Sequence, residues 1–260
     1  NMTERECNRE LSLNSKGYSI DEVDPTSITF QIDQDPLETG VNFYKSNRIT
    51  LQPGLTVLIG CNGAGKTTFI NQIEAICKQN DIAVFSFRNI KDGGTNFTEY
   101  MLDHDTAKGA RRLVQSEGEN ICDSLLTTAS RIAKVVKSST TKAISNRCVV
   151  IMDGIDSGLS IDALDVVKND LLKFIPEVEK DNDINVYMIA TSNNFELVQN
   201  ERCFDVVSSS YKTFKTYSVY KSFIKDSSKK KDIRDEMIDK NRKERKRIES
   251  KRINLDLIKR

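Results

Sequence analysis

The sequence predicts an α/β fold with a mixed β-sheet, and two apolar strand patterns are the main evidence. Residues 55–59 form a short apolar, β-branched run that leads into a glycine-rich segment, and residues 69–76 then carry apolar side chains at helical spacing. A strand, a glycine-rich loop and a helix in this order are the context of a phosphate-binding loop. Residues 148–152 form a second apolar run that ends at Asp153, as expected for a buried parallel strand.

Three segments near the N-terminus alternate apolar and polar residues, which predicts half-buried strands. These segments are residues 27–32, 41–44 and 48–51. We expect them to form an antiparallel flap that leads into the glycine-rich region. Phe43 or Tyr44 of this flap can stack on an adenine ring, but aromatic residues in strands belong more often to the core, which is the reading we favour.

The glycine-rich segment matches the pattern G-x-x-x-x-G-K-[ST] from Gly60 to Thr67. Glycines let backbone N–H groups approach phosphate oxygens, and the next helix directs its positive end at them. In such a loop the Lys66 ammonium reaches the β- and γ-phosphates and the Thr67 hydroxyl ligates Mg²⁺. A glycine turn that matches by chance is the alternative. The predicted nucleotide-binding residues of this loop are Gly60, Asn62, Gly63, Ala64, Gly65, Lys66, Thr67 and Thr68.

A further strand is predicted at residues 82–87, and the polar residues Arg88, Asn89 and Asp92 follow it. Ligands of open α/β sheets lie beyond the carboxyl ends of the strands, so these three residues are candidates for contact with the metal or a phosphate. A glycine turn with solvated polar side chains explains the same residues equally well.

Residues 97–136 carry apolar side chains three and four positions apart, which predicts a helical subdomain at about residues 97–140. Within it, Ser116 precedes a helix that is predicted to begin near Glu119. Serine is a favoured N-cap residue, and a carboxylate in the first turn complements the helix dipole.

Asp153 ends the second apolar run, where its carboxylate is placed to enter the shell of a bound Mg²⁺. An aspartate that caps the following turn is the alternative. Beyond it the patterns predict a helix at residues 161–174, a strand at 185–190 and a terminal strand region that includes 206–208 and 216–220.

The C-terminal residues differ from the rest of the chain in charge. Residues 226–260 contain 14 Lys+Arg and 8 Asp+Glu, a net charge of +6, which leaves 25 Lys+Arg and 30 Asp+Glu, a net charge of −5, in residues 1–225. We therefore divide the chain into a nucleotide-binding domain, residues 1–225, and a basic tail, residues 226–260, that is helical or flexible. Basic runs can contact nucleic acid, but the tail lacks aromatic residues for base stacking, and a solvated surface is the favoured interpretation.

Composition disfavours several classes of protein. No run of about 18 apolar residues occurs, so no membrane-spanning helix is predicted. The polar N-terminus lacks the apolar core of a signal peptide, which predicts a cytoplasmic protein. The 6 cysteines form no C-x-x-C pair and share no metal-ligand spacing with the single histidine, so neither zinc nor redox chemistry is indicated.

Together, these motifs resemble those of the ABC-type ATPases, in particular the small SMC-like and OLD-like ATP-binding heads, over about residues 27–207. The resemblance implies a P-loop NTPase of the ABC-ATPase type that binds ATP and Mg²⁺. Cys61 stands where proline is usual in this family. The chain as a whole also resembles small phage and Gram-positive bacterial ATP-binding proteins of unassigned role.

Two further segments carry this resemblance. Ser116, Gly118 and Glu119 are similar to the family's signature motif, which reaches across a dimer to the γ-phosphate held by the partner. Residues 156–159 are similar to its D-loop. The resemblance therefore implies an ATP-dependent homodimer in which Ser116, Gly118 and Glu119 contact nucleotide.

Three positions depart from the family pattern. Gly154 replaces the glutamate that orients the attacking water, Ser192 replaces a histidine, and Arg88 and Asn89 stand where a glutamine is usual. Loss of one water-orienting group can cost on the order of 10³ in rate, so tight Mg·ATP binding with slow hydrolysis is expected. Asp156 is a possible substitute for the missing carboxylate. The predicted catalytic residues are Lys66, Asp153 and Asp156, and the predicted metal ligands are Thr67 and Asp153.

The predicted function is that of an ATP-dependent dimer that acts as a switch on a protein or nucleic-acid partner. A non-catalytic ATP-binding regulatory module is the alternative, because the binding groups are kept and the hydrolytic groups are missing. An ABC transporter subunit is less favoured, because the glutamine is missing and the tail is basic. The sequence names no physiological partner.

Overall fold

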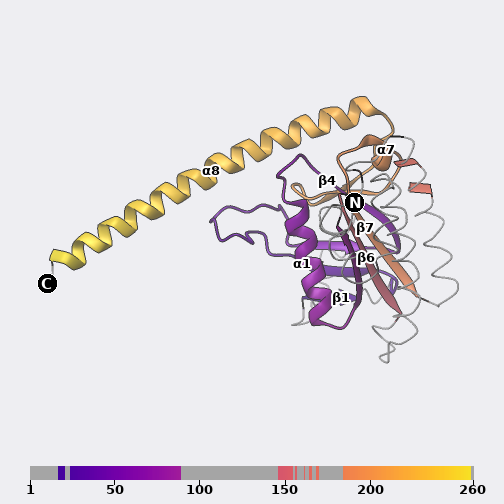
Figure 1. The fold of residues 1–260 in the computed structure, drawn as a ribbon, viewed down its shortest axis with the longest axis horizontal. Coiled ribbons are helices and arrows are strands. Elements are labelled where there is room, and N and C mark those ends of the chain that lie inside the picture. The colour runs from indigo at the N-terminus through magenta and orange to yellow at the C-terminus, as the bar shows by residue number, and fades with distance from the viewer. Residues whose placement is uncertain are drawn as a thin grey trace, which may run out of the picture.

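The computed structural model describes residues 17–20, 24–88, 146–154, 156, 161, 164–165, 168–169 and 184–258 of the 260-residue chain. Its larger sheet has six strands in the order β5-β6-β7-β4-β8-β9. Figure 1 labels three neighbouring strands of this sheet, β4, β7 and β6. These strands are Gly54–Ile59 (β4), Ala83–Arg88 (β5), Arg147–Asp153 (β6), Asn185–Thr191 (β7), Cys203–Asp205 (β8) and Ser210–Lys212 (β9). All neighbours pair in parallel except β8 and β9, which are antiparallel. The predicted mixed α/β sheet is confirmed.

The strand order brings three loops to one edge of this sheet. Strand β7 lies between β4, which carries the glycine-rich loop, and β6, which ends at Asp153. Because these strands are parallel, the loops that follow β4, β6 and β7 converge beyond their carboxyl ends. The strands predicted at residues 82–87, 148–152 and 185–190 are confirmed as β5, β6 and β7.

A three-stranded antiparallel sheet, in the order β1-β2-β3, precedes β4. Its strands are Tyr18–Ile20 (β1), Ile28–Gln31 (β2) and Arg48–Leu51 (β3). The predicted antiparallel flap is therefore confirmed, and β1 is a strand that the sequence pattern did not predict.

The strand predicted at residues 41–44 is wrong. Phe43 and Tyr44 are neighbours and both are buried, at 9% and 1% exposure, whereas a half-buried strand buries alternate residues. The segment is instead a loop that Gln34 holds in place. The Phe43 N–H donates to the Gln34 carbonyl, and the Gln34 side-chain amide donates to the carbonyls of Tyr44 and Lys45.

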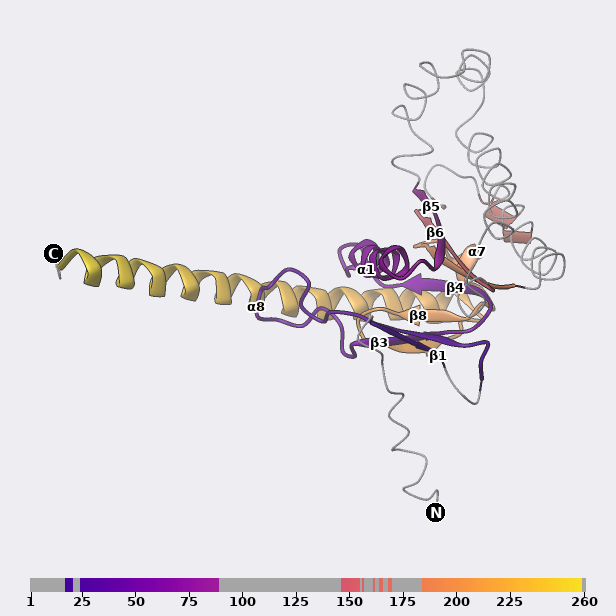
Figure 2. The same cartoon turned by 90° about the horizontal axis from the view of Figure 1, so that it is seen from below.

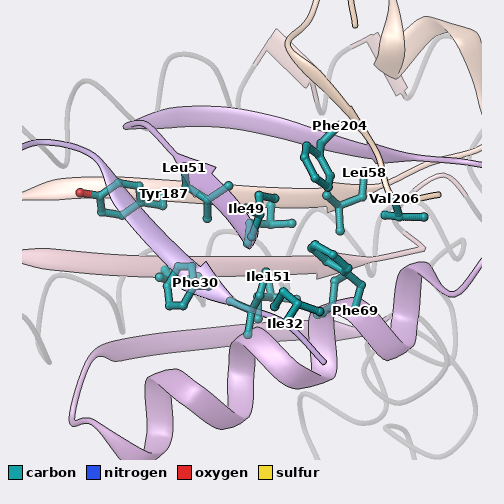
Figure 3. Packing of buried hydrophobic residues seen from close by; sticks show 14 of the residues in the cluster. Phe30, Ile32, Ile49, Leu51, Leu58, Phe69, Ile151, Tyr187, Phe204 and Val206 are labelled. Carbon is teal, nitrogen blue, oxygen red and sulfur yellow. The ribbon is translucent and has the colours of Figure 1, made fainter. Parts of the chain in front are cut away.

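Helix α1, Lys66–Gln79, and the flap cover the same face of the larger sheet. Figure 3 shows Phe69 of α1 pointing into this core beside Leu58 and Ile32. The Phe69 ring lies edge-on to Tyr44, with centroids 5.0 Å apart, and 5.7 Å from Phe204. The predicted helix is confirmed, and its aromatic contacts hold its first turn, and therefore the glycine-rich loop, against the sheet.

The opposite face of the larger sheet packs against helix α7, Phe195–Val198, and residues near the start of the C-terminal helix. In β4, Leu58 joins the core beneath α1, while its neighbours Val57 and Ile59 join the core on this opposite face. Both faces of the strand are buried, which is why its sequence is an uninterrupted apolar run.

Helix α8, Tyr217–Ile258, contains 42 residues. The strand predicted at residues 216–220 is therefore wrong. Tyr220 and Phe223 lie one helical turn apart, and both rings pack against Phe214, with centroids 5.4 Å and 5.2 Å away. Helical spacing is what brings the two rings onto this shared aromatic contact.

The strand predicted at residues 206–208 is also wrong. These residues form the turn between β8 and β9. The Asp205 carboxylate accepts hydrogen bonds from the Val207 N–H at 3.1 Å and from the Ser208 hydroxyl at 2.5 Å, an arrangement in which aspartate stabilises a turn.

Residues 226–258 belong to helix α8, so the domain boundary predicted at residue 226 falls inside this helix. Figures 1 and 2 show α8 running along the body and then continuing beyond it to the C-terminus. In the described part of the chain, no helix combines the length and the apolar composition needed to cross a membrane.

Candidate nucleotide-binding site

A cleft of about 1060 Å³ lies beyond the carboxyl ends of β4, β5, β6 and β7. The side chains that line it include Lys66 and Thr67 at the start of α1, Arg88 at the end of β5, and Asp153 at the end of β6. A triphosphate is a small, highly charged ligand, and the cleft offers cations, hydroxyls and carboxylates from separate elements within one space. The predicted convergence of the glycine-rich loop with Asp153 is therefore observed.

Gly60 and Gly65 of the glycine-rich loop adopt backbone conformations that favour glycine. Gly60 has φ 146°, and a Cβ there would lie 2.9 Å from Cβ of Ala64. Gly65 has φ 103°, a left-handed conformation, and a Cβ there would lie 3.1 Å from the Tyr44 hydroxyl. Gly65 is also the N-cap of α1, and among the described residues no side chain caps this end. The helix start is thus suited to an anionic ligand.

Lys66 extends from α1 back across the glycine-rich loop. Its Nζ donates to the carbonyls of Gly60 at 2.7 Å and Cys61 at 3.2 Å, and to Oδ1 of Asn193 at 3.0 Å. Burial lowers the pKa of Lys66, while the negative charges of nearby groups, including Asp156 and Asp153, oppose this shift. The Lys66 ammonium therefore lies beside two carbonyls of the glycine-rich loop, and Asn193 is its contact in the loop after β7.

Asp153 is oriented by hydroxyl groups. Its Oδ1 accepts a hydrogen bond from Thr191 Oγ1 at 2.6 Å and lies 3.5 Å from Thr67 Oγ1. The Gly154 N–H in turn donates to Thr191 Oγ1 at 2.8 Å. These contacts hold the Asp153 carboxylate beside the hydroxyl that is predicted to bind the metal.

Thr67 and Asp153 together suit Mg²⁺. Mg²⁺ prefers oxygen ligands, keeps several waters and is usually held by one or two protein groups together with substrate phosphates. Within the described residues, no cluster of three or more His, Cys, Asp or Glu side chains could hold a metal by itself. A hydroxyl and a carboxylate that meet at a phosphate-binding loop therefore fit a metal that arrives with a nucleotide.

Asp156 stabilises the loop that follows β7. Its Oδ2 accepts hydrogen bonds from the Ser192 hydroxyl at 2.8 Å, from the Asn193 N–H at 2.7 Å and from the Asn194 N–H at 3.1 Å. Ser192, at the position where the resemblance implies a histidine, is 1% exposed. The Ser192 hydroxyl thus connects the loop after β7 with the loop after β6 by donating to Asp156.

Asn193 is a site residue that sequence reasoning missed. Its amide nitrogen donates to Asn62 Oδ1 at 2.8 Å, and its Oδ1 accepts from Lys66. The side chain therefore bridges the loop after β7 to the glycine-rich loop. The available signal was its position at the carboxyl end of a predicted parallel strand, where ligand contacts gather.

Of the three polar residues predicted to follow the strand at residues 82–87, the structure describes Arg88, which is the last residue of β5 and lies in the cleft as the sequence suggested. Asn89 and Asp92 fall outside the described residues. So do Ser116, Gly118 and Glu119 and the helical subdomain predicted at about residues 97–140. The nucleotide contacts expected of these residues remain predictions.

Phe43 and Tyr44 both belong to the buried core, as favoured from the sequence. The Tyr44 hydroxyl donates to the Gly65 carbonyl at 3.0 Å. Burial raises the pKa of Tyr44. Phe43 lines the cleft, and the guanidinium carbon of Arg234 lies 4.3 Å from the centre of its ring.

Helix α8 contacts the outer side of the glycine-rich loop through residues that the sequence did not single out. The Arg234 guanidinium donates to the carbonyls of Gly63 at 2.8 Å and Ala64 at 3.2 Å, and the Cys61 N–H donates to Ser227 Oγ at 3.1 Å. Ser227 and Arg234 are 3% and 8% exposed. Their spacing of two helical turns was the only sequence signal that they share a face.

Comparison with protein families places this site in a wider context. A family model described as an AAA domain matches residues 39–259, which include the glycine-rich loop, Asp153 and all of α8. Comparison with curated proteins gives no match. The family match covers most of the chain and agrees with the observed phosphate-binding loop and mixed sheet. The chain therefore belongs to the AAA-domain family of P-loop ATPases.

Proposed function

We propose that this protein binds Mg·ATP in the cleft and hydrolyses it slowly. The observation that supports this proposal best is the meeting of Lys66, Thr67 and Asp153 around the start of α1. Lys66 would bind the β- and γ-phosphates, and the backbone N–H groups of the glycine-rich loop would bind the remaining phosphate oxygens. Thr67 and Asp153 would hold Mg²⁺, which supplies positive charge at the phosphate oxygens.

Slow hydrolysis follows from the residues around Asp153. Gly154 has a left-handed backbone conformation, with φ 72°, and as a glycine it carries no carboxylate that could orient the attacking water. The Ser192 hydroxyl is engaged by Asp156. Among the described residues, Asp153, Glu74 and Asp156 are the carboxylates that line the cleft, and three hydrogen-bond donors already approach Oδ2 of Asp156.

A single-turnover experiment tests the rate. Protein in excess over ATP in magnesium buffer is expected to convert ATP to ADP and phosphate at less than about 1 s⁻¹, a usual lower value for enzymes. Asp153→Asn is expected to slow the reaction further, because it removes the charge that faces the metal. A wild-type rate well above this value would contradict slow hydrolysis. No turnover despite ATP binding would favour the alternative, a non-catalytic regulatory module.

The proposed biological form is an ATP-dependent homodimer that acts on a protein or nucleic-acid partner. Support comes from the resemblance of Ser116, Gly118 and Glu119 to a signature motif that contacts the partner's γ-phosphate. Charge-assisted hydrogen bonds to a phosphate are strong, so such contacts would stabilise the dimer when ATP is bound. The basic residues of the C-terminal tail are a possible contact for nucleic acid.

Sedimentation velocity tests the dimer. At a Mg·ATP concentration that saturates the wild type but not the variant, the wild-type chain of 29.4 kDa is expected to shift toward twice its mass, while Lys66→Ala stays a monomer because it binds the shared nucleotide more weakly. Lys229→Ala is the matched control, since this side chain is 78% exposed on α8 and contacts only Asp226 at 3.7 Å among the described ion pairs. If wild type and Lys66→Ala sediment alike with and without Mg·ATP, the dimer is excluded.

A further inference from the structure

The cleft contains a second partly buried cation besides Lys66. Arg88 is the last residue of β5 and pairs in register with Asp153 at the end of β6. Its NH1 lies 3.5 Å from Asp153 Oδ2, and its NH2 lies 2.5 Å from Glu74 Oε2 on α1. The three side chains are only 15–16% exposed. Arg88 thus connects the metal-binding carboxylate with the helix that follows the phosphate-binding loop.

Glu74 is a strong anchor for this guanidinium. It also accepts a hydrogen bond from Lys78 Nζ at 2.6 Å. Burial by itself raises the pKa of Glu74, but hydrogen bonds from Lys78 and Arg88 outweigh it and hold the pKa at about 2. Glu74 is therefore ionised at neutral pH, and one side of the Arg88 guanidinium is fixed while its NH1 faces Asp153.

The two oxygens of Asp153 face different groups. Oδ1 is directed to Thr67 and Thr191, and Oδ2 is directed to Arg88. The Asp153 carboxylate therefore lies between Arg88 and the Thr67 hydroxyl, which is placed to bind Mg²⁺. Arg88 lines the cleft from the end of β5, and Lys66 lines it from the start of α1. A triphosphate bound in this cleft would carry its highest charge near both cations.

We propose that Arg88 is a catalytic residue that binds the γ-phosphate of ATP and stabilises the negative charge of the hydrolytic transition state from within the same chain. This proposal rests on the proposed function of the cleft. Phosphoryl transfer needs little covalent chemistry from the protein, and an arginine at the transferred phosphate can raise the rate by orders of magnitude. Arg88 then accounts for hydrolysis by a site that has Gly154 where the resemblance implies a glutamate.

In this step the oxygen of a water molecule forms a bond to the γ-phosphorus, and the bond from that phosphorus to the β–γ bridging oxygen breaks. The electron pair of the broken bond stays on ADP, and the proton lost by the water passes to the phosphate produced. Arg88 acts here only through its charge and its hydrogen-bond donors, and it takes no part in the proton transfer. Its planar fork can keep one contact with Glu74 while the other is directed to the phosphate.

The test compares Arg88→Ala and Arg88→Lys with Lys78→Ala. Lys78 contacts the same Glu74 carboxylate but is 65% exposed, so it controls for the loss of a cation that neutralises Glu74. Three quantities are measured for each variant: the single-turnover rate, the affinity for ATP, and the affinity for Mg·ADP with aluminium fluoride, which imitates the transition state. Arg88→Ala is expected to lower the rate and the aluminium fluoride affinity by about 10²–10³-fold. Its ATP affinity is expected to stay within about threefold of wild type, because the contact strengthens only in the transition state.

Arg88→Lys keeps the charge but lacks the fork, and an intermediate loss is expected. Lys78→Ala is expected to match wild type in all three measurements. A purely structural role predicts that ATP and the aluminium fluoride complex lose affinity equally, and this result would overturn the proposal, as would an unchanged rate in both Arg88 variants. If Arg88→Ala does not fold, the ratio of the ATP affinity to the aluminium fluoride affinity in Arg88→Lys decides between a catalytic and a structural role. Failure of the proposed function is distinguishable, because wild type would then bind neither ATP nor the aluminium fluoride complex.

Discussion

Replacing Arg234 with alanine is expected to lower the free energy of unfolding by about 2–4 kcal/mol. The guanidinium donates to two carbonyls of the phosphate-binding loop and lies over the ring of Phe43, and Arg234 is only 8% exposed. Alanine would remove a charged donor and leave the buried Ala64 carbonyl and the part-buried Gly63 carbonyl without it, which is more costly than the loss of an exposed contact. Urea unfolding of the wild type and the variant measures the difference.

Arg242→Ala is the matched control for this prediction. Arg242 is an exposed arginine of the same helix, and its replacement is expected to change the free energy of unfolding by no more than about 0.5 kcal/mol. Equal effects of the two substitutions would show that α8 does not stabilise the phosphate-binding loop through Arg234. A larger change in the free energy of unfolding for Arg234→Ala than for Arg242→Ala would show that α8, despite its charged sequence, belongs to the nucleotide-binding domain.

Replacing Lys66 with alanine is expected to weaken ATP binding about 10- to 100-fold. A hydrogen bond to a charged group contributes about 1.5–3 kcal/mol, and 1.4 kcal/mol corresponds to a tenfold change in affinity. Titration with a fluorescent ATP analogue measures the change, and Lys229→Ala, which removes an exposed ammonium from α8, is expected to bind like wild type.

Lys66 also binds the carbonyls of Gly60 and Cys61, so the variant's fold needs its own check. Thermal unfolding without nucleotide provides it: a cooperative transition would show that the loss of affinity comes from the ligand contact. If folded Lys66→Ala bound ATP as tightly as wild type, Lys66 would not contact the phosphates.

The elements that the sequence predicted correctly are those whose signal is local. Strand β4 and the first turns of α1 are determined by an apolar run, a glycine pattern and helical spacing within about twenty residues, and β6 is an apolar run ending in Asp153. The meeting of Lys66, Thr67 and Asp153 could be anticipated although they are distant in the chain, because local patterns place them after parallel strands and the carboxyl ends of parallel strands lie together.

The errors come from residues whose role depends on distant contacts. Residues 41–44 alternate like a strand, but both Phe43 and Tyr44 are buried because α1 and α8 approach them from two sides. Arg234 lies in a charged stretch that is typical of a solvated tail, yet it is bonded to carbonyls about 170 positions earlier in the chain. No local pattern distinguishes such an arginine from its exposed neighbours.

The account depends on Mg·ATP binding at the start of α1, and isothermal titration calorimetry of the wild-type chain tests this most directly. We predict a saturable heat of binding for ATP in magnesium buffer, with a stoichiometry of about one nucleotide per chain, as one phosphate-binding loop per chain requires. The absence of any binding heat for ATP, ADP and GTP in the same buffer would contradict the account.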